Sequence, residues 1–254
     1  MNRLIFLGTG TSQGVPIIGC HCEVCRSEDQ KDKRLRASLY IEYAGRKILI
    51  DAGPDFRQQL LREGIEDLDA ILLTHEHIDH TGGLDDIRAI NYCKQKPVPI
   101  YCEERVLMAF KKEFYYVFEK DKYPGIPEFD IRVIYNEPFL MDGIEVVPIR
   151  AYHHRLPVLG YRIGNIAYIT DASNIPEQEF TKLKELDILI ISTIRREKHI
   201  SHFSLEEAIK VVSKAGAKES LFTHLSHQIG THNDLARSIP AGIEPAYDRL
   251  ILTF

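Results

Sequence analysis

The sequence has no surplus of positive charge and no long hydrophobic run. Its formal net charge is −5 at pH 7, and its isoelectric point is about 6.1. We therefore expect no nucleic-acid partner, because binding through surface charge needs a basic face. The N-terminal apolar run is too short for a signal peptide, and no stretch approaches the length of a membrane span. These absences predict a cytoplasmic protein without a membrane partner.

The chain also lacks an even set of cysteines: it has five, which does not suit a disulfide framework. Cys20, Cys22 and Cys25 lie together in the stretch GCHCEVC. In a reducing compartment such a cluster more often holds a metal ion, and unmetallated thiols are the alternative. Cys93 and Cys102 are expected to pack as small apolar residues.

Short apolar runs alternate with helical patterns along the whole chain, without a long linker or a low-complexity tract. The runs are rich in Ile, Val and Tyr, as in RLIFLG, KILIDAG and LDILIIS, and predict strands. Helices are predicted over residues 56–64, 83–95, 104–120, 176–186 and 204–216. Ser204 and Glu207 form a capping box at the start of the last helix, which Gly216 ends. The pattern predicts a single α/β domain over residues 1–254, with two sheets and helices outside them.

Polar residues follow directly after four of the predicted strands. Asp51, His75, Asp171 and His224 each stand where an apolar run ends. Because a sheet fixes such a residue while the loop leaves its side chain exposed, we expect these residues to share one site.

The stretch HEHIDH, residues 75–80, is the densest group of potential metal ligands. His75 and His77 alternate along an extended segment and can point the same way, while Asp79 and His80 follow on a turn. Neutral imidazole together with carboxylate suits zinc, manganese or iron with an open position for water. A polar surface loop is the alternative.

This H-x-H-x-D-H pattern resembles the signature of the metallo-β-lactamase superfamily, which implies a four-layer αββα sandwich with a two-metal site. By resemblance, His75, His77 and His154 hold one metal, Asp79, His80 and His224 hold the other, and Asp171 bridges them. His154 is preferred to His153 because only His154 matches the family pattern H-x(5)-G-Y. Asp51 matches an early aspartate that orients the ligands without binding metal, although an ordinary turn aspartate is the alternative. His77 stands where redox members carry glutamate, which favours hydrolysis.

The cysteine cluster needs a fourth ligand if it holds a structural zinc ion. His227, in the stretch THLSHQ, is the preferred candidate, and His21 is the competing one. Zinc bound by the loop at residues 20–25 and by His227 would brace the segment that carries His224.

These motifs together resemble the PhnP-like family of phosphoribosyl cyclic phosphate phosphodiesterases over nearly the full chain. The resemblance implies two active-site ions, manganese or zinc, and one structural zinc. It also implies a small phosphodiester substrate, cyclic in that family, which a bridging hydroxide attacks. It also implies that His202, before the capped helix, is the general acid, with a surface histidine as the alternative. Arg88 is a weaker candidate for binding phosphate, and a solvated helix arginine is its alternative. The aromatic segment 103–122 either covers a substrate ring or packs in the core.

Three other functions remain as alternatives to a phosphodiesterase. A tRNA 3′-processing nuclease shares the histidine pattern, but the sequence shows neither its glycine-rich arm nor a basic surface. A thioester or lactone hydrolase uses the same metals. A non-catalytic accessory protein of cofactor biosynthesis is disfavoured because the ligand set looks complete. A homodimer is compatible with all of these functions.

Overall fold

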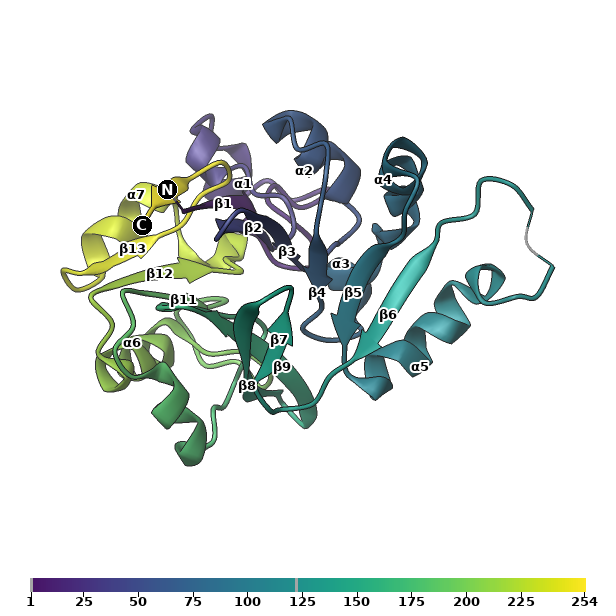
Figure 1. The fold of residues 1–254 in the computed structure, drawn as a ribbon. Coiled ribbons are helices and arrows are strands. Elements are labelled where there is room, and N and C mark those ends of the chain that lie inside the picture. Colours follow the sequence, from purple (N-terminus) through teal and green to yellow (C-terminus); the bar gives the residue numbers. More distant parts are fainter. Residues whose placement is uncertain (1, 122) are drawn as a thin grey trace. The chain divides into compact units, whose positions relative to one another are not determined.

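The computed structural model describes residues 2–121 and 123–254, which form two compact units (Figure 1). Unit 1 comprises residues 1–8, 38–135 and 249–254, and unit 2 comprises residues 9–37 and 136–248. Each unit contains one seven-stranded mixed sheet. The prediction of an α/β fold with two sheets is confirmed.

The sheet of unit 1 has the strand order β14-β1-β2-β3-β4-β5-β6. Its strands are β1 (Arg3–Gly8), β2 (Ser38–Tyr43), β3 (Arg46–Ile50), β4 (Ala70–Leu72), β5 (Val98–Cys102), β6 (Phe129–Val133) and β14 (Ile251–Thr253). Strands β3 to β6 run parallel, so their carboxyl ends share one edge. The helices are α2 (Phe56–Glu63), α3 (Ile78–Thr81), η2 (Leu84–Asp86), α4 (Ile87–Lys94), α5 (Glu104–Glu113) and η3 (Tyr115–Val117).

One apolar core joins α2, α4 and α5 to this sheet. Phe56, Ile90 and Phe110 come from the three helices and pack with strand residues such as Ile71 and Ile100. Burial of these side chains fixes the helices on the sheet, and each contributes about 1.5–3 kcal/mol before entropy costs. The loops that leave the parallel strands therefore start from rigid positions.

The sheet of unit 2 has the order β13-β12-β11-β10-β9-β8-β7. Its strands are β7 (Phe139–Met141), β8 (Ile144–His153), β9 (Leu156–Ile163), β10 (Ile166–Ile169), β11 (Ile188–Ser192), β12 (Glu219–Thr223) and β13 (Ile243–Pro245). The helical segments are α1 (Glu23–Arg26), η1 (Gln30–Asp32), η4 (Glu177–Leu183), α6 (Leu205–Ala215), η5 (His227–Ile229) and α7 (His232–Ser238). The predicted capping box is present, because Ser204 and Glu207 exchange hydrogen bonds.

Three sequence-based predictions need correction. The helix predicted over 104–120 ends at Glu113, and Phe114 leaves the helix so that its ring packs 5.9 Å from those of Phe110 and Phe129. The segment 177–183 is a 3₁₀-helix rather than an α-helix. Cys102 is buried as expected, but Cys93 is exposed on α4.

Candidate metal centre

The histidine loop, residues 74–82 of unit 1, is held by the turn that follows β3. The backbone N–H of Ala52 donates to the carbonyl of His80 at 2.8 Å, and that of Gly83 donates to the carbonyl of Ala52 at 2.9 Å. A Cβ at Gly83 would lie 2.1 Å from the carbonyl oxygen of Gly53, so only glycine permits this approach. The pair of glycines after the histidines thus lets the loop lie against the sheet.

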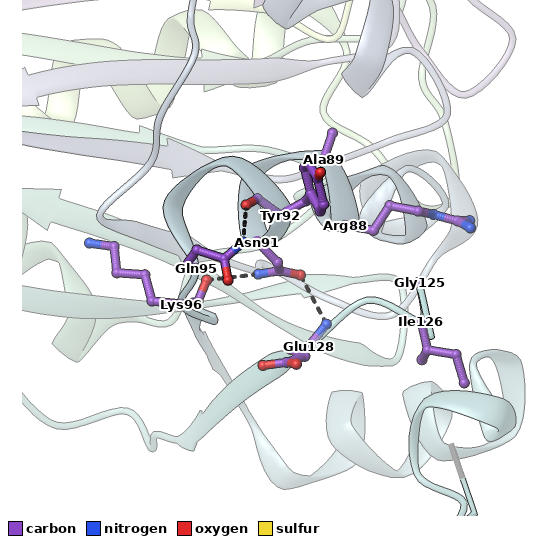
Figure 2. Close-up of a pocket in the computed structure, with 9 residues that line it drawn as sticks. All are labelled: Arg88, Ala89, Asn91, Tyr92, Gln95, Lys96, Gly125, Ile126 and Glu128. Carbon is purple, nitrogen blue, oxygen red and sulfur yellow. Dashed lines mark hydrogen bonds between the residues drawn. The ribbon is translucent and has the colours of Figure 1, made fainter. Parts of the chain in front are cut away.

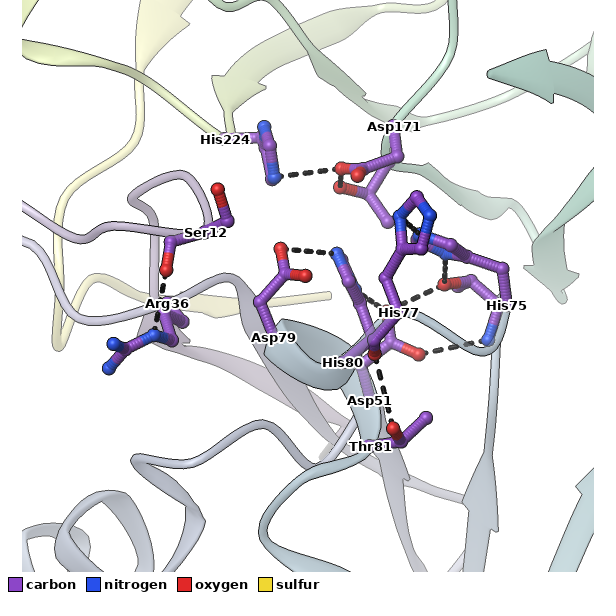
Figure 3. Close-up of polar contacts among 12 residues, drawn as sticks. Ser12, Arg36, Asp51, His75, His77, Asp79, His80, Thr81, Asp171 and His224 are labelled. Atoms are coloured by element: carbon purple, nitrogen blue, oxygen red, sulfur yellow. Dashed lines mark hydrogen bonds and ion pairs between the residues drawn. The ribbon is translucent and has the colours of Figure 1, made fainter. Parts of the chain in front are cut away.

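The carboxylate of Asp51 contacts the histidine loop and orients two of its histidines. Asp51 lies in the left-handed region, at φ 63°, directly after β3, and its carboxylate is fully buried. The carboxylate accepts a hydrogen bond from His80 Nδ1 at 2.7 Å (Figure 3). It also accepts one from the Thr74 hydroxyl at 2.9 Å, and that hydroxyl lies 2.9 Å from His75 Nδ1. Burial raises the pKa of Asp51 above its usual value, although the contacts with His80 and Thr74 oppose this.

This network assigns the proton positions on two histidines. Because the Thr74 hydroxyl donates to Asp51, it accepts from His75 Nδ1–H, and Asp51 accepts from His80 Nδ1–H. The Nε2 atoms of His75 and His80 therefore carry lone pairs that are available to a metal ion.

The histidine loop presents two pairs of donor atoms. His75 Nε2 lies 3.0 Å from His77 Nδ1, and His80 Nε2 lies 3.1 Å from Asp79 Oδ2. Metal–ligand bonds of about 2.0–2.2 Å in tetrahedral geometry separate two ligands by roughly 3.3–3.6 Å, close to both distances. The chemistry and spacing of both pairs thus fit divalent metal ions.

Unit 2 carries a further group of donors at the ends of its strands. Asp171 follows β10 and His224 follows β12, both in the left-handed region, at φ 50° and 56°. His224 Nε2 lies 2.8 Å from Asp171 Oδ1 (Figure 3). His153, the last residue of β8, and His202 offer ligand atoms within 4.8 Å of one another and of Asp171.

The structure does not bring His154 into this group, which goes against the choice made from the sequence. His154 is exposed and lies in the β8–β9 turn, where its backbone is in the left-handed region at φ 56°. Its backbone N–H donates to the Ser173 hydroxyl at 3.0 Å. His153 points toward Asp171 instead, and its Nδ1 donates to the carbonyl of Ser201 at 2.7 Å. The sequence pattern identified the pair of adjacent histidines but not which of the two lies beside Asp171.

His202 lies among other histidines and is almost fully buried. Its ring stacks on that of His224 at 5.1 Å and lies 4.5 Å from that of His153 and 5.1 Å from that of His199. Burial lowers the pKa of His202 to about 3, with Asp171 opposing the shift and the neighbouring histidines adding to it. The alternative interpretation of His202 as a surface histidine is wrong, because only 8% of the residue is exposed.

The Cys/His cluster, made of Cys20, Cys22, Cys25 and His227, lies within unit 2. His227 Nδ1 is 3.3, 3.4 and 3.6 Å from the three sulfur atoms in that order. A hydrogen bond from the Cys25 backbone lowers the pKa of Cys22 to about 6, whereas burial raises that of Cys25 to about 11. Three sulfurs around one imidazole nitrogen match a closed zinc site, and His21 is not part of the group.

The segment with His227 is tied to the segment that leads from β11 toward His202. The carbonyl of Ile194 accepts hydrogen bonds from the backbone N–H of Ser226 at 3.1 Å and from its hydroxyl at 2.6 Å. Arg195 donates to the side chain of Gln228 at 3.3 Å. The Cys/His cluster therefore adjoins both His224, three residues away, and the loop of His202.

Arg88 lies on α4, where its guanidinium pairs with Asp85 and its Nε donates to the Asp85 carbonyl at 3.1 Å. It lines a hollow of about 500 Å³ together with Tyr92 and Gln95 (Figure 2). The carboxylate of Asp85 already balances the Arg88 charge, so the geometry lends no support to a phosphate contact.

Comparisons with known proteins identify the family. A model described as "Beta-lactamase superfamily domain" matches residues 46–225. A protein of Porphyromonas gingivalis named octanoyltransferase is 47% identical over 251 residues, which make up 98% of this chain and 51% of that protein. The coenzyme PQQ synthesis protein B of Xanthomonas oryzae is 28% identical over 160 residues, which make up 58% of this chain and 50% of that protein. These matches span about half the length of either curated relative.

Solved structures give the same assignment. A diphosphatase of the PhnP family is 39% identical, with a TM-score of 0.93 over 100% of this chain and 98% of that one. Zinc-bound PqqB of Methylobacterium extorquens has a TM-score of 0.79 over 99% of this chain and 100% of that one, and its 20% identity shows the fold alone. The chain belongs to the beta-lactamase superfamily and has the metallo-β-lactamase fold. Within that superfamily it is similar to a diphosphatase of the PhnP family.

Among the residues that the structure describes, no helix is long and apolar enough to cross a membrane.

Proposed function

We propose that the protein hydrolyses a small phosphodiester or an esterified diphosphate with the help of two divalent metal ions. This proposal rests on the two donor pairs of the histidine loop, because both pairs have the spacing of metal ligands. The pairs are His75 with His77 and Asp79 with His80. The full ligand set that we propose is His75, His77, Asp79, His80, His153, Asp171 and His224. It follows the family pattern except that His153 replaces His154.

When bound, divalent ions supply Lewis acidity and lower the pKa of water, so that a nucleophile forms near neutral pH. Asp79 and Asp171 are the only two carboxylates in the proposed set, and they leave two divalent ions with a net positive charge. Such a site attracts an anionic phosphoryl group. Asp51 and Thr74 keep His75 and His80 in the tautomer that binds metal.

We assign His202 the transfer of a proton to the leaving oxygen. Its place beside His153 and His224 supports this role. The form that transfers the proton is the imidazolium, and an anionic substrate beside His202 shifts its pKa back upward because this charged form gains a partner.

The Cys/His cluster is proposed to hold a structural zinc ion. Three sulfurs and one imidazole nitrogen complete a four-ligand set, which leaves no open position for a substrate. The ion would brace the segment of His224 and, through Ser226 and Ile194, the loop of His202.

An acyl substrate is the second candidate, and the relative named octanoyltransferase is the observation that favours it. That name belongs to a protein about twice as long as the matched region, so it does not assign octanoyl transfer to the matched half. A thioester hydrolase would use the same metal ligands on carbon instead of phosphorus.

The test is a substrate panel on protein loaded with manganese or zinc. The panel contains bis(p-nitrophenyl) phosphate, cyclic phosphodiesters, dinucleoside diphosphates and an S-octanoyl thioester. We expect cleavage of phosphorus substrates, and loss of that activity in the His75→Ala/His77→Ala double variant. Thioester cleavage alone would replace the proposal with its second candidate, and a protein inactive on all four classes despite full metal loading would refute both.

A further inference from the structure

The aromatic segment contacts both ends of the stretch that carries the histidines. Arg105, on the first turn of α5, forms an ion pair with Glu76, which lies between His75 and His77. The hydroxyl of Tyr116 donates to Asp85 Oδ1 at 2.5 Å, beyond the other end of the loop. Residues 104–117 therefore hold the loop region through two polar contacts about ten residues apart in the sequence.

The helix that supplies Arg105 has a fixed position. Val106 and Phe110, on the face of α5 that packs on the sheet, are buried in the core of unit 1. The rings of Phe110 and Phe114 meet edge to face at 5.9 Å, which anchors the end of the helix. Because Arg105 directly precedes Val106, its guanidinium extends from a rigid backbone.

Glu76 gives the histidine loop an additional contact with α5. Asp51 and Thr74 fix the side chains of His75 and His80, whereas the His77 side chain is exposed. The His77 carbonyl accepts hydrogen bonds from the His80 backbone N–H at 2.9 Å and from the Thr81 hydroxyl at 3.1 Å, both on its C-terminal side, and the ion pair of Glu76 adds a contact on its N-terminal side. The side chains of Glu76 and Arg105 are only 22% and 31% exposed, so their pairing is partly shielded from water.

We propose that Arg105 is a positioning residue, which holds the backbone between His75 and His77 through Glu76 so that both rings meet one metal ion. Tyr116 does the same for the end of the stretch through Asp85. The consequence for metal binding rests on the proposed function above, whereas the effect on the loop itself does not. Part of the aromatic segment thus supports the histidine loop.

Hydrogen exchange on the metal-free protein tests the effect on the loop. The amides of Thr74, His80 and Gly82 are hydrogen-bonded within this region and report its opening. In Arg105→Ala we expect their exchange to be about two- to fivefold faster, the range for losing a partly exposed ion pair. Arg105→Lys should restore most of the protection because it keeps the charge.

Arg132→Ala is the matched control, because Arg132 also pairs with a carboxylate in unit 1, Asp130 on β6. It should leave exchange in the histidine loop unchanged. Equal exchange in Arg105→Ala and wild type, or equally faster exchange in both alanine variants, would overturn the assignment.

Metal titration then tests the consequence for binding. In Arg105→Ala we expect the histidine loop to bind metal with a two- to fivefold weaker affinity, roughly the same factor as the faster exchange. The zinc content of the Cys/His cluster should stay unchanged. If wild type binds metal only at the Cys/His cluster, the proposed function fails, while the exchange experiment still decides whether Arg105 holds the loop. If exchange rises but affinity for the loop metal stays the same, Arg105 is a structural contact and the positioning role is wrong.

Discussion

His80 Nδ1 donates a 2.7 Å hydrogen bond to Asp51 Oδ2, and both side chains are completely or almost completely buried. The pair joins the end of β3 to the histidine loop, 29 residues further along the chain. The opposite ring nitrogen, Nε2, is thereby aimed away from Asp51 with its lone pair available. Asp51 therefore decides which nitrogen of His80 can bind a metal ion.

The first prediction concerns this pair. Asp51→Asn removes the charge but keeps the shape, so the His80 ring loses its strongest acceptor and its preferred tautomer. We expect active-site metal affinity to fall about 10- to 100-fold, as for other residues that orient metal-bound histidines. Isothermal titration with Mn²⁺ or Zn²⁺ measures the change.

The control for Asp51→Asn is Asp69→Asn, the same substitution elsewhere in unit 1. Asp69 accepts the backbone N–H of Lys47 at 2.8 Å and has no part in the histidine network. Metal affinity should remain at the wild-type level in this variant. An equal loss in both variants would show that general destabilisation, and not the orientation of His80, explains the effect.

Much of the fold follows from local patterns that the sequence displays openly. Strand β10 is a continuous apolar run, β11 is apolar up to its last residue, and β3 ends in the apolar run ILI, while α6 has both a capping box and a glycine stop, so each was predictable. Strand β6, FDIRV, is partly exposed and has charges at alternate positions, while β13 spans only three residues and includes Pro245. Such segments become strands only because a neighbouring strand pairs with them.

The site was predictable where ligand spacing is local and not where it depends on a turn. The donors of the histidine loop lie within six residues, and their spacing alone identifies them. His153 and His154 are adjacent, and the choice between them depends on where β8 ends and the left-handed turn begins. The contact between Arg105 and Glu76 is also invisible in the sequence, because it forms only when α5 packs on the sheet.

The second prediction concerns the Cys/His cluster. His227→Ala removes the only nitrogen donor of the group, so we expect the protein to lose about one tightly held zinc ion per chain. Its melting temperature should fall by several degrees, since an ion that binds only the folded state stabilises it. Atomic absorption after dialysis and a thermal melt measure the two effects.

Cys93→Ser is the control for this variant, because Cys93 is an exposed cysteine on α4 outside the cluster. It should keep the zinc ion and the melting temperature of wild type. Retention of all zinc in His227→Ala would contradict the assignment and return attention to His21 as fourth ligand.

The third prediction concerns acid stability and Glu179 in unit 2. Burial raises the pKa of this carboxyl, but the hydrogen bond from Lys182 and those from Asn136 and the Arg150 backbone outweigh burial and leave the pKa below its usual value. A lowered folded-state pKa gives stability that is present above the unfolded value of about 4.3 and is lost as pH falls through the folded value.

Glu179→Gln should therefore lower the free energy of unfolding by about 1–3 kcal/mol at neutral pH, the range for weakening a buried hydrogen-bonded group. The difference from wild type should shrink as the pH falls below about 4. Urea denaturation across this pH range measures both. Glu206→Gln, at an exposed pair with Lys210 on α6, should change little at any pH. A constant difference between Glu179→Gln and wild type at all pH values would show that the charge of Glu179 is not responsible.

The fourth prediction separates the two neighbouring histidines at the end of β8. His153 offers a ligand atom beside Asp171 and His202, and its Nδ1 is fixed by the carbonyl of Ser201. His154 is exposed in the turn that follows. We expect His153→Ala to weaken binding of one active-site metal by about tenfold or more, because a positioned ligand is removed. The metal affinity of His154→Ala should stay within about twofold of wild type, as is usual for surface substitutions.

Metal titration and turnover of bis(p-nitrophenyl) phosphate measure both variants. Because the two residues are adjacent, each variant serves as the control for the other. The reverse order of effects would restore His154 as the ligand and require the β8–β9 turn to change its conformation when metal binds.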